Sequence, residues 1–166
     1  MGAREKAYLE GMFSDFHVTA DEYSLTFDDP EIERICVEKW GSDGAVTARA
    51  LSSIVALGND WNVFQNNTSI IKATDLIYFS GLTGSNMFSM GGCTNMTEVT
   101  LPPNITQLNA TFRSCTSLTT INGLNHITSL KNSVFTNCES LQSLVFTNLS
   151  GECEIGEMSN SALTEV

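Results

Sequence analysis

The sequence predicts an α+β fold in which a short solenoid, a stack of parallel β coils, follows an N-terminal helical cap. A seven-residue phrase recurs at a fixed step, apolar residues recur between its copies, and helical patterns precede them. The phrase begins at Cys93, Cys115 and Cys138, and a shortened copy begins at Ser161, so the steps are 22, 23 and 23 residues. Such a period is typical of solenoids whose units bury their apolar edges only against their neighbours.

Apolar residues between the copies keep the same spacing, as leucine-rich-repeat solenoids require. The residues three positions before each copy are Met90, Phe112, Phe135 and Met158. We expect Cys93, Cys115 and Cys138 to stack as small buried side chains, because free cysteine behaves as a hydrophobic residue. An odd count of five cysteines, with no Cys-x-x-Cys or Cys/His pairing, argues against a disulfide framework or a metal site.

The repeat strands are expected at 98–101, 120–124 and 143–146, paired in parallel at about 4.8 Å per coil. Side chains alternate along a strand, so one set should point inward and the other outward. The inward set is Met96, Val99, Leu101, Leu118, Ile121, Leu141, Leu144 and Phe146. The outward set is Glu98, Thr100, Thr120, Asn122, Ser143 and Val145. This outward row is small, polar and nearly uncharged, which suits a protein surface or a neutral glycan, although any solvated sheet face shows the same pattern.

The N-terminal region predicts helices. Asp29 followed by Pro30 is a strong start signal, an N-cap acceptor before proline at the first helical position. The inward face of that helix would carry Ile32, Ile35, Cys36 and Trp40. A further helix is expected over 3–16, extended chain over 16–27, and another helix from Ala48 to Leu57.

The loop between the last two helices raises the question of calcium. A helix, a short Asp-Gly loop and a second helix have the outline of a calcium-binding hand. Such a loop needs several oxygen ligands and a carboxylate about six residues after its glycine. This loop offers only Asp43, with Ala50 or Leu51 where the late acid belongs, so we predict a degenerate loop and no metal. Residues 61–82 read as an irregular first repeat, and we divide the chain into a cap, 1–66, and repeats, 67–166.

The phrase Phe-x-x-Cys-x-x-Leu-x-x-Ile, with Leu101-Pro102 after a copy, resembles the BspA-like leucine-rich repeats of surface proteins from host-associated bacteria. The segment before it, with Ile35-Cys36-Val37 and Tyr78-Phe79-Ser80-Gly81, is similar to a lead-in that often precedes such repeats. The resemblance covers 31–166 and implies a non-catalytic adhesion or protein-binding module.

Composition excludes several other functions. With a formal charge of −11 and only eight scattered basic residues, the chain lacks the clustered cations that nucleic acid or an anionic membrane requires. No run of eighteen apolar residues is present, so membrane insertion is not expected. The two histidines, His17 and His126, stand far apart, and no catalytic or phosphate-binding motif occurs. We therefore predict no catalytic residues, no cofactor and no enzyme activity.

The N-terminus shows no signal peptide, which leaves a chain trimmed of its leader or a phage component released at lysis. Either route predicts an extracellular or surface-exposed location, on the bacterial envelope or a phage particle. The alternative function is therefore a structural part of an assembly such as a phage particle or fibre. Leu163 to Val166 stops partway into a fourth unit, so we expect its open edge to be covered by a partner or a second copy.

Overall fold

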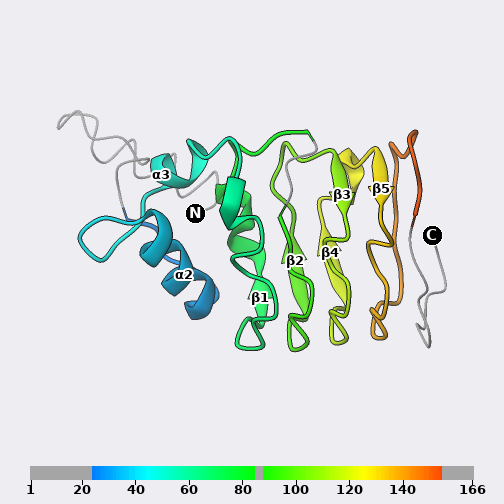
Figure 1. Cartoon of the computed structure of the whole chain (residues 1–166), viewed down its shortest axis with the longest axis horizontal. Coiled ribbons are helices and arrows are strands. Elements are labelled where there is room, and N and C mark those ends of the chain that lie inside the picture. The colour runs from blue at the N-terminus through cyan, green and yellow to red at the C-terminus, as the bar shows by residue number, and fades with distance from the viewer. Residues whose placement is uncertain (1–23, 85–87, 155–166) are drawn as a thin grey trace.

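The computed structural model describes residues 24–84 and 88–154, which form an α+β repeat fold (Figure 1). The helices α2 (Pro30–Trp40) and α3 (Ala48–Ser52) come first, and short parallel strands follow them, side by side, toward the C-terminal end. The expected helix over 3–16, most of the extended stretch over 16–27 and the last copy at 161–166 lie outside the described residues.

Helix α2 forms where the sequence predicts it. Asp29 Oδ1 accepts hydrogen bonds from the backbone N–H groups of Glu31 and Ile32, at 2.9 and 3.2 Å, and proline fills the first helical position. The residues buried on its inner face are Ile32, Ile35 and Cys36. Trp40, also expected inside, is only partly buried, and its ring meets Phe79 edge-to-face at 5.3 Å. The helix therefore packs its predicted face against the first repeat.

Helix α3 is shorter than predicted, since it ends at Ser52 rather than Leu57. The hydroxyls of Ser52 and Ser53 donate to backbone carbonyls one turn earlier, at 3.2 and 2.8 Å. Serine hydroxyls that bond the preceding turn compete with continuation of a helix. Gly58, the residue after the predicted helix, begins a short 3-10 turn, η3 (Gly58–Asp60).

The Asp-Gly loop before α3 is closed by backbone geometry. The N–H of Ser42 donates to the carbonyl of Ala45 at 2.8 Å, and the N–H of Ala45 donates back at 3.0 Å. Asp43 and Gly44 both have positive φ, 53° and 77°. Two left-handed central residues define the tight turn that Asp-Gly favours, so turn chemistry alone accounts for this dipeptide.

We name the described repeats by the residue aligned with each recurring cysteine: A (67–92), B (93–114), C (115–137) and D (138–154). The first strands of A, B and C, β1 (Lys72–Ala73), β2 (Glu98–Thr100) and β4 (Thr120–Asn122), form a parallel sheet in the order β1-β2-β4. The parallel pairing of β2 with β4 confirms the prediction for these two strands, whereas β1 was not predicted as a strand. A second parallel pair, β3 (Gln107–Asn109) with β5 (Ser129–Lys131), was not predicted.

Two predicted strand boundaries are wrong. Strand β4 ends at Asn122 rather than Leu124, because Gly123 turns left-handed, with φ 92°, before the 3-10 turn η5 (Leu124–His126). The segment expected as a strand over 143–146 holds only an isolated bridge position, at Ser143. The parallel pairing that joins the first sheet ends at β4 within the described residues.

The recurring cysteines form the predicted buried column. Cys93, Cys115 and Cys138 are free and fully buried. Each thiol donates to the backbone carbonyl three positions before the preceding aligned position, that of Phe64, Met90 and Phe112, at 3.0, 3.1 and 3.1 Å. Burial raises the pKa of Cys93 to about 11 and that of Cys138 to about 12. Each of these side chains therefore fills its layer of the core as a neutral thiol.

Most of the predicted inward side chains are buried as expected. The fully or almost fully buried ones are Met96, Val99, Leu101, Leu118, Leu141 and Leu144. Ile121 and Phe146 are only partly buried and pack against the edge of the core. Phe112 and Phe135, the residues three positions before their cysteines, stack with ring planes 5° apart and centroids at 5.9 Å. Equivalent residues thus meet their counterparts in the next repeat.

Polar side chains link the repeats as regularly as the apolar ones do. Thr97 Oγ1 donates to the carbonyl of Ile71 at 3.2 Å, and Thr119 Oγ1 donates to the carbonyl of Thr97 at 3.0 Å. Asn95 and Asn104 donate in the same direction to backbone carbonyls of repeat A, at 2.9 and 2.7 Å. The carbonyls of Ile71 and Thr97 also accept backbone N–H groups of the next repeat, so the threonine hydroxyls add a further hydrogen bond at each of these two carbonyls. The abundance of threonine and asparagine is therefore partly structural.

The helical segment is joined to repeat A by buried carboxylates. Asp29 Oδ2 accepts hydrogen bonds from the N–H groups of Ile71 and Lys72, at 2.8 and 2.9 Å, at the edge strand β1. Asp75 Oδ2, in repeat A, accepts from the N–H groups of Asp28 and Asp29 at 3.0 and 3.3 Å. Each segment thus supplies an acceptor to the backbone of the other. Whether the chain divides at residue 66 stays a prediction.

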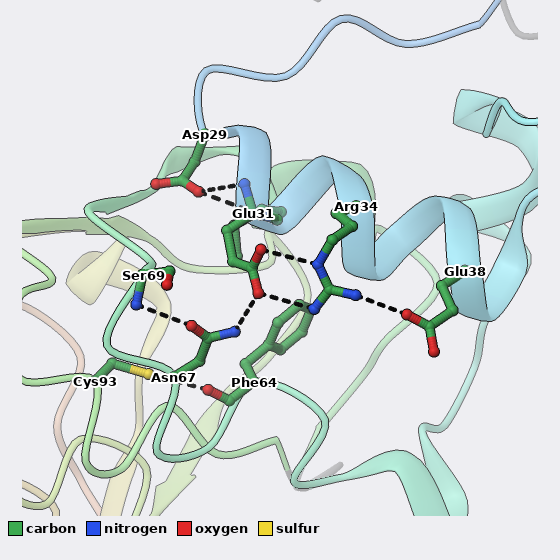
Figure 2. A network of polar contacts seen from close by, with 9 residues as sticks. Asp29, Glu31, Arg34, Glu38, Phe64, Asn67, Ser69 and Cys93 are labelled. Carbon is green, nitrogen blue, oxygen red and sulfur yellow. Dashed lines mark hydrogen bonds and ion pairs between the residues drawn. The ribbon is translucent and has the colours of Figure 1, made fainter.

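A second, more exposed network crosses the same junction (Figure 2). The Glu31 carboxylate accepts from Arg34 at 2.9 and 2.8 Å and from Asn67 Nδ2 at 2.7 Å. Arg34 also pairs with Glu38 at 2.7 Å, and Asn67 Oδ1 accepts from the N–H of Ser69. Hydrogen bonds from Arg34 and Asn67 lower the pKa of Glu31 to about 2. One carboxylate therefore links α2 to the turn that opens repeat A.

Candidate functional site

The strand face predicted as a binding surface begins on β2 and β4. Glu98 and Thr100 lie on β2, and the parallel register places them beside Thr120 and Asn122 of β4. The two β2 residues are half-buried, whereas the two β4 residues are exposed. These four predicted residues therefore form one continuous surface.

Asn122 of β4 connects to both polar side chains of β2. Its Nδ2 donates to Glu98 Oε1 at 3.2 Å and to Thr100 Oγ1 at 3.3 Å. Glu98 also pairs with Lys72 of β1, with an Nζ to Oε2 distance of 3.8 Å. The carboxylate of Glu98 is therefore already engaged by the protein, and Asn122 lies at the centre of the polar row.

An open hollow of about 380 Å³ lies beside β4. Four predicted residues line it: Thr120, Asn122, Ser143 and Val145. Ser143 and Val145 come from repeat D, and both are exposed. Glu98 and Thr100 do not line the hollow. The hollow spans repeats C and D beside β4, the last strand of the first sheet within the described residues.

Other lining residues were missed by the sequence analysis: Thr119, Ile121, Gly123, Leu124 and Asn125. The Asn-Gly pair at 122–123 was the available signal, because asparagine followed by glycine commonly marks a turn. That turn ends β4 and brings Asn125 to the rim. The carbonyl of Asn125 accepts hydrogen bonds from the side chains of Thr147, at 3.2 Å, and Asn148, which tie repeat D to repeat C.

The chemistry of this hollow is that of a binding surface. Among the described residues, its lining contains no acidic, basic or histidine side chain. Hydroxyls and amides provide hydrogen-bond donors and acceptors, while Val145, 56% exposed, and Ile121 provide apolar contact. A hydroxyl without a neighbouring base is a poor nucleophile. The arrangement therefore favours a neutral polar ligand over a reaction.

Within 24–84 and 88–154, no group of three or more His, Cys, Asp and Glu side chains is arranged to hold a metal ion. His126 Nε2 is buried without a hydrogen-bond partner, and His17 lies outside the described residues. No helix in the described ranges has the length and apolar character needed to cross a membrane.

Comparison with known proteins yields one family. A family model described as a BspA type leucine rich repeat region matches residues 62–166, with six copies. No curated protein and no solved structure matches the chain significantly. The matched span includes both strand sheets, the cysteine column and the whole hollow beside β4.

Proposed function

The chain belongs to the BspA-type leucine-rich repeat family over residues 62–166, and from this premise we propose that it is an interaction module that binds a protein or a surface glycan through its strand face. Leucine-rich repeats generally mediate protein binding without catalysis, and BspA-type repeats are typically found in surface proteins. We propose an extracellular or surface-exposed location on the same ground. The observation that carries the proposal is the uncharged hollow beside β4, lined by Thr120, Asn122, Ser143 and Val145.

The lining favours a neutral glycan as the first ligand to test. Sugars present many hydroxyls, which the hydroxyls and amides of the hollow can match as both donors and acceptors. The apolar surface of Val145 and Ile121 can contact the C–H face of a sugar ring. A highly charged ligand would find no counter-ion there. A protein ligand with a polar, uncharged loop remains the alternative within the same function.

The test is a glycan array and a pull-down with the triple variant T120A/N122A/S143A. We expect the variant to bind the ligands of the wild type at least about tenfold more weakly, or not at all, because three hydrogen-bonding groups disappear from the hollow. The triple variant T26A/N59A/S24A, which changes exposed residues of the same kinds outside the hollow, is the matched control. Equal binding by wild type and the T120A/N122A/S143A variant would refute a role for the strand face.

We also propose that residues 1–66 act as a helical cap on a solenoid formed by 67–166. Support comes from Asp29, whose carboxylate occupies two N–H groups beside the edge strand β1. An uncovered strand edge is a template for pairing with another chain. The alternative function, a structural part of a phage particle or fibre, was argued from residues 163–166. These lie outside the described residues, and that alternative stays a prediction.

A further inference from the structure

A second hollow, of about 460 Å³, is lined by the segments that precede the aligned positions 67, 93 and 115. It spans the end of repeat B, the end of repeat A and the chain just before repeat A. Its principal lining residues are Trp61, Gln65, Asn66, Gly91, Asn109 and Arg113. None of them lines the hollow beside β4. Its volume falls in the range of about 300–1,000 Å³ that small-molecule sites occupy.

This hollow exists because one repeat lacks a side chain that its neighbours carry. Two positions before the aligned cysteine position stand Gln65, Gly91, Arg113 and Thr136 in successive repeats. Gly91 therefore leaves a gap between the side chains of Gln65 and Arg113. A Cβ atom at Gly91 would lie 3.3 Å from the carbonyl oxygen of Arg113 and 3.7 Å from Gln65 Nε2. The gap is bordered closely on both sides by polar groups.

Arg113 provides the charge of this hollow. Its side chain is exposed and makes no ion pair or hydrogen bond within the described part of the chain. Arg34, Lys39 and Lys72, by contrast, each pair with a carboxylate. Unpaired arginine is notable in a chain with a net charge of −11, where carboxylates are plentiful. A guanidinium offers a planar fork of donors that matches a carboxylate bidentately.

An aromatic ring and two amides accompany this charge. Trp61 is 37% exposed, and its carbonyl accepts a hydrogen bond from the N–H of Ser89 at 2.8 Å, which anchors the segment that carries the ring. The side chains of Gln65 and Asn66 make no hydrogen bonds within residues 24–84 and 88–154. An indole ring provides a flat apolar surface, and free amides provide both donors and acceptors. The site thus combines stacking, neutral hydrogen bonding and a single cation.

We propose that this second hollow binds a sugar that carries a carboxylate, with the ring against Trp61 and the carboxylate on Arg113. A neutral sugar would leave the guanidinium unused. A polyphosphate ligand would require several clustered cations, whereas the described lining of this hollow has one. The free amides of Gln65 and Asn66 would bind the ring hydroxyls. This site is separate from the strand face, so either can exist without the other.

The test is calorimetric titration of the full chain with methyl glucuronide and methyl glucoside, which differ in a carboxylate against a hydroxymethyl group. We expect saturable binding of the glucuronide and binding at least about tenfold weaker of the glucoside. The R113Q variant should lose about tenfold or more in glucuronide affinity and change little toward the glucoside. The W61A variant should weaken both, and added salt should weaken only the glucuronide.

Two control variants distinguish this site from others. R49Q removes an exposed arginine that does not line the hollow, and N122A alters the strand face; both should bind the glucuronide as wild type does. Circular dichroism checks that each variant is folded. Equal affinity for the two glycosides, or an unchanged R113Q variant, would overturn the proposal. So would the absence of saturable binding of both the glucuronide and a methyl glycoside of N-acetylneuraminic acid.

Discussion

Asp29 and Asp75 are both buried carboxylates at the junction of the helical segment and repeat A, but they work differently. Asp29 uses both oxygens, one for the N-terminus of α2 and the other for the N–H groups of Ile71 and Lys72. Asp75 uses a single oxygen, Oδ2, for the N–H groups of Asp28 and Asp29. An asparagine amide has only one acceptor oxygen, so it can replace the carboxylate of Asp75 but not that of Asp29.

We therefore predict that two isosteric variants change the free energy of unfolding by unequal amounts. D29N should lower the free energy of unfolding by about 2–3 kcal/mol, because an NH₂ group would face backbone donors that are left unsatisfied. D75N should change it by less than about 1 kcal/mol at neutral pH, since its carbonyl can accept both bonds. Urea titration measures both values. Similar losses in the two variants would contradict the assignment of two acceptor oxygens to Asp29.

The pH dependence of the free energy of unfolding gives an independent check on Asp75. Burial raises the pKa of Asp75 above its ordinary value. The folded state then holds this proton more tightly than the unfolded chain, whose pKa is about 3.9. The contribution of Asp75 to stability therefore declines as pH rises from about 4 through the raised pKa. D75N should remove that decline. Identical profiles of unfolding free energy from pH 3 to 8 in wild type and D75N would show that Asp75 does not cause the decline.

The cysteines predict a selective chemical reactivity. Only thiolates react readily, and burial raises the pKa of Cys36 and Cys138 to about 12 and that of Cys93 to about 11. Burial raises the pKa of Cys115 as well. Cys153 is the exposed one of the five. Iodoacetamide at pH 8 should label Cys153 alone in the folded protein and all five in urea, as read by mass spectrometry. Rapid labelling of Cys115 under native conditions would show that the column is not closed.

At the scale of the element, one backbone feature recurs before every aligned cysteine position. Asn66, Gly92, Ser114 and Asn137 stand there, and all four have positive φ. The N–H groups of Asn66, Gly92 and Ser114 each donate to a carbonyl of the next repeat, at 2.8, 2.8 and 2.7 Å. The left-handed residue thus aims a donor along the stack at each turn.

Adjacent glycines in repeat A allow this turn to be tested. A Cβ atom at Gly92 would lie 2.2 Å from Asn66 Oδ1, and its φ of 77° disfavours any other residue. We predict that G92A lowers the free energy of unfolding by about 1–2 kcal/mol or more. Gly91 has no positive φ, and its Cβ would meet nothing closer than 3.3 Å, so G91A should cost less than about 1 kcal/mol. Thermal unfolding of both variants makes the comparison, and equal losses would contradict it.

The sequence predicts some elements better than others, for physical reasons. Helix α2 and strands β2 and β4 have strong local signals, a capping pair and an alternating pattern beside a repeated cysteine. Strands β3 and β5 do alternate polar and apolar residues, but each is only three residues long and lacks a repeated cysteine phrase beside it, so the pattern was too short to predict a strand. Helix α3 was overextended because serine hydroxyls bond back to its own turn, a choice that composition does not reveal.

At the scale of the molecule, the candidate site was also predicted only in part. The repeat register correctly places Glu98 beside Thr120 and Thr100 beside Asn122. The hollow itself depends on where strand pairing stops and where Gly123 turns, which are properties of several repeats together. The gap at Gly91 likewise appears only when equivalent positions of neighbouring repeats are compared. Periodicity therefore predicts the surfaces, and departures from periodicity create the hollows.

The charge of the whole chain predicts a salt effect on stability. A net charge of −11 opposes compaction through self-repulsion, and the ion pairs of the described residues are few and exposed. Raising NaCl from about 20 to about 500 mM at pH 8 should increase the free energy of unfolding by roughly 1 kcal/mol. Near pH 4.4, the isoelectric point, the same addition should have a much smaller effect. Equal effects at the two pH values would rule out self-repulsion as the cause.

Several threonine and cysteine side-chain donors that link the repeats point the same way along the stack. Thr97 reaches back to Ile71 as Thr119 reaches back to Thr97, and Cys93, Cys115 and Cys138 do the same. Each repeat therefore offers to the repeat after it the same kind of acceptor carbonyls that the repeat before it offers. A gene segment that encodes 22 or 23 residues could be copied or deleted in place, and the flanking units would still fit each other. Such a protein can change its reach in evolution by whole units, without new junctions having to arise.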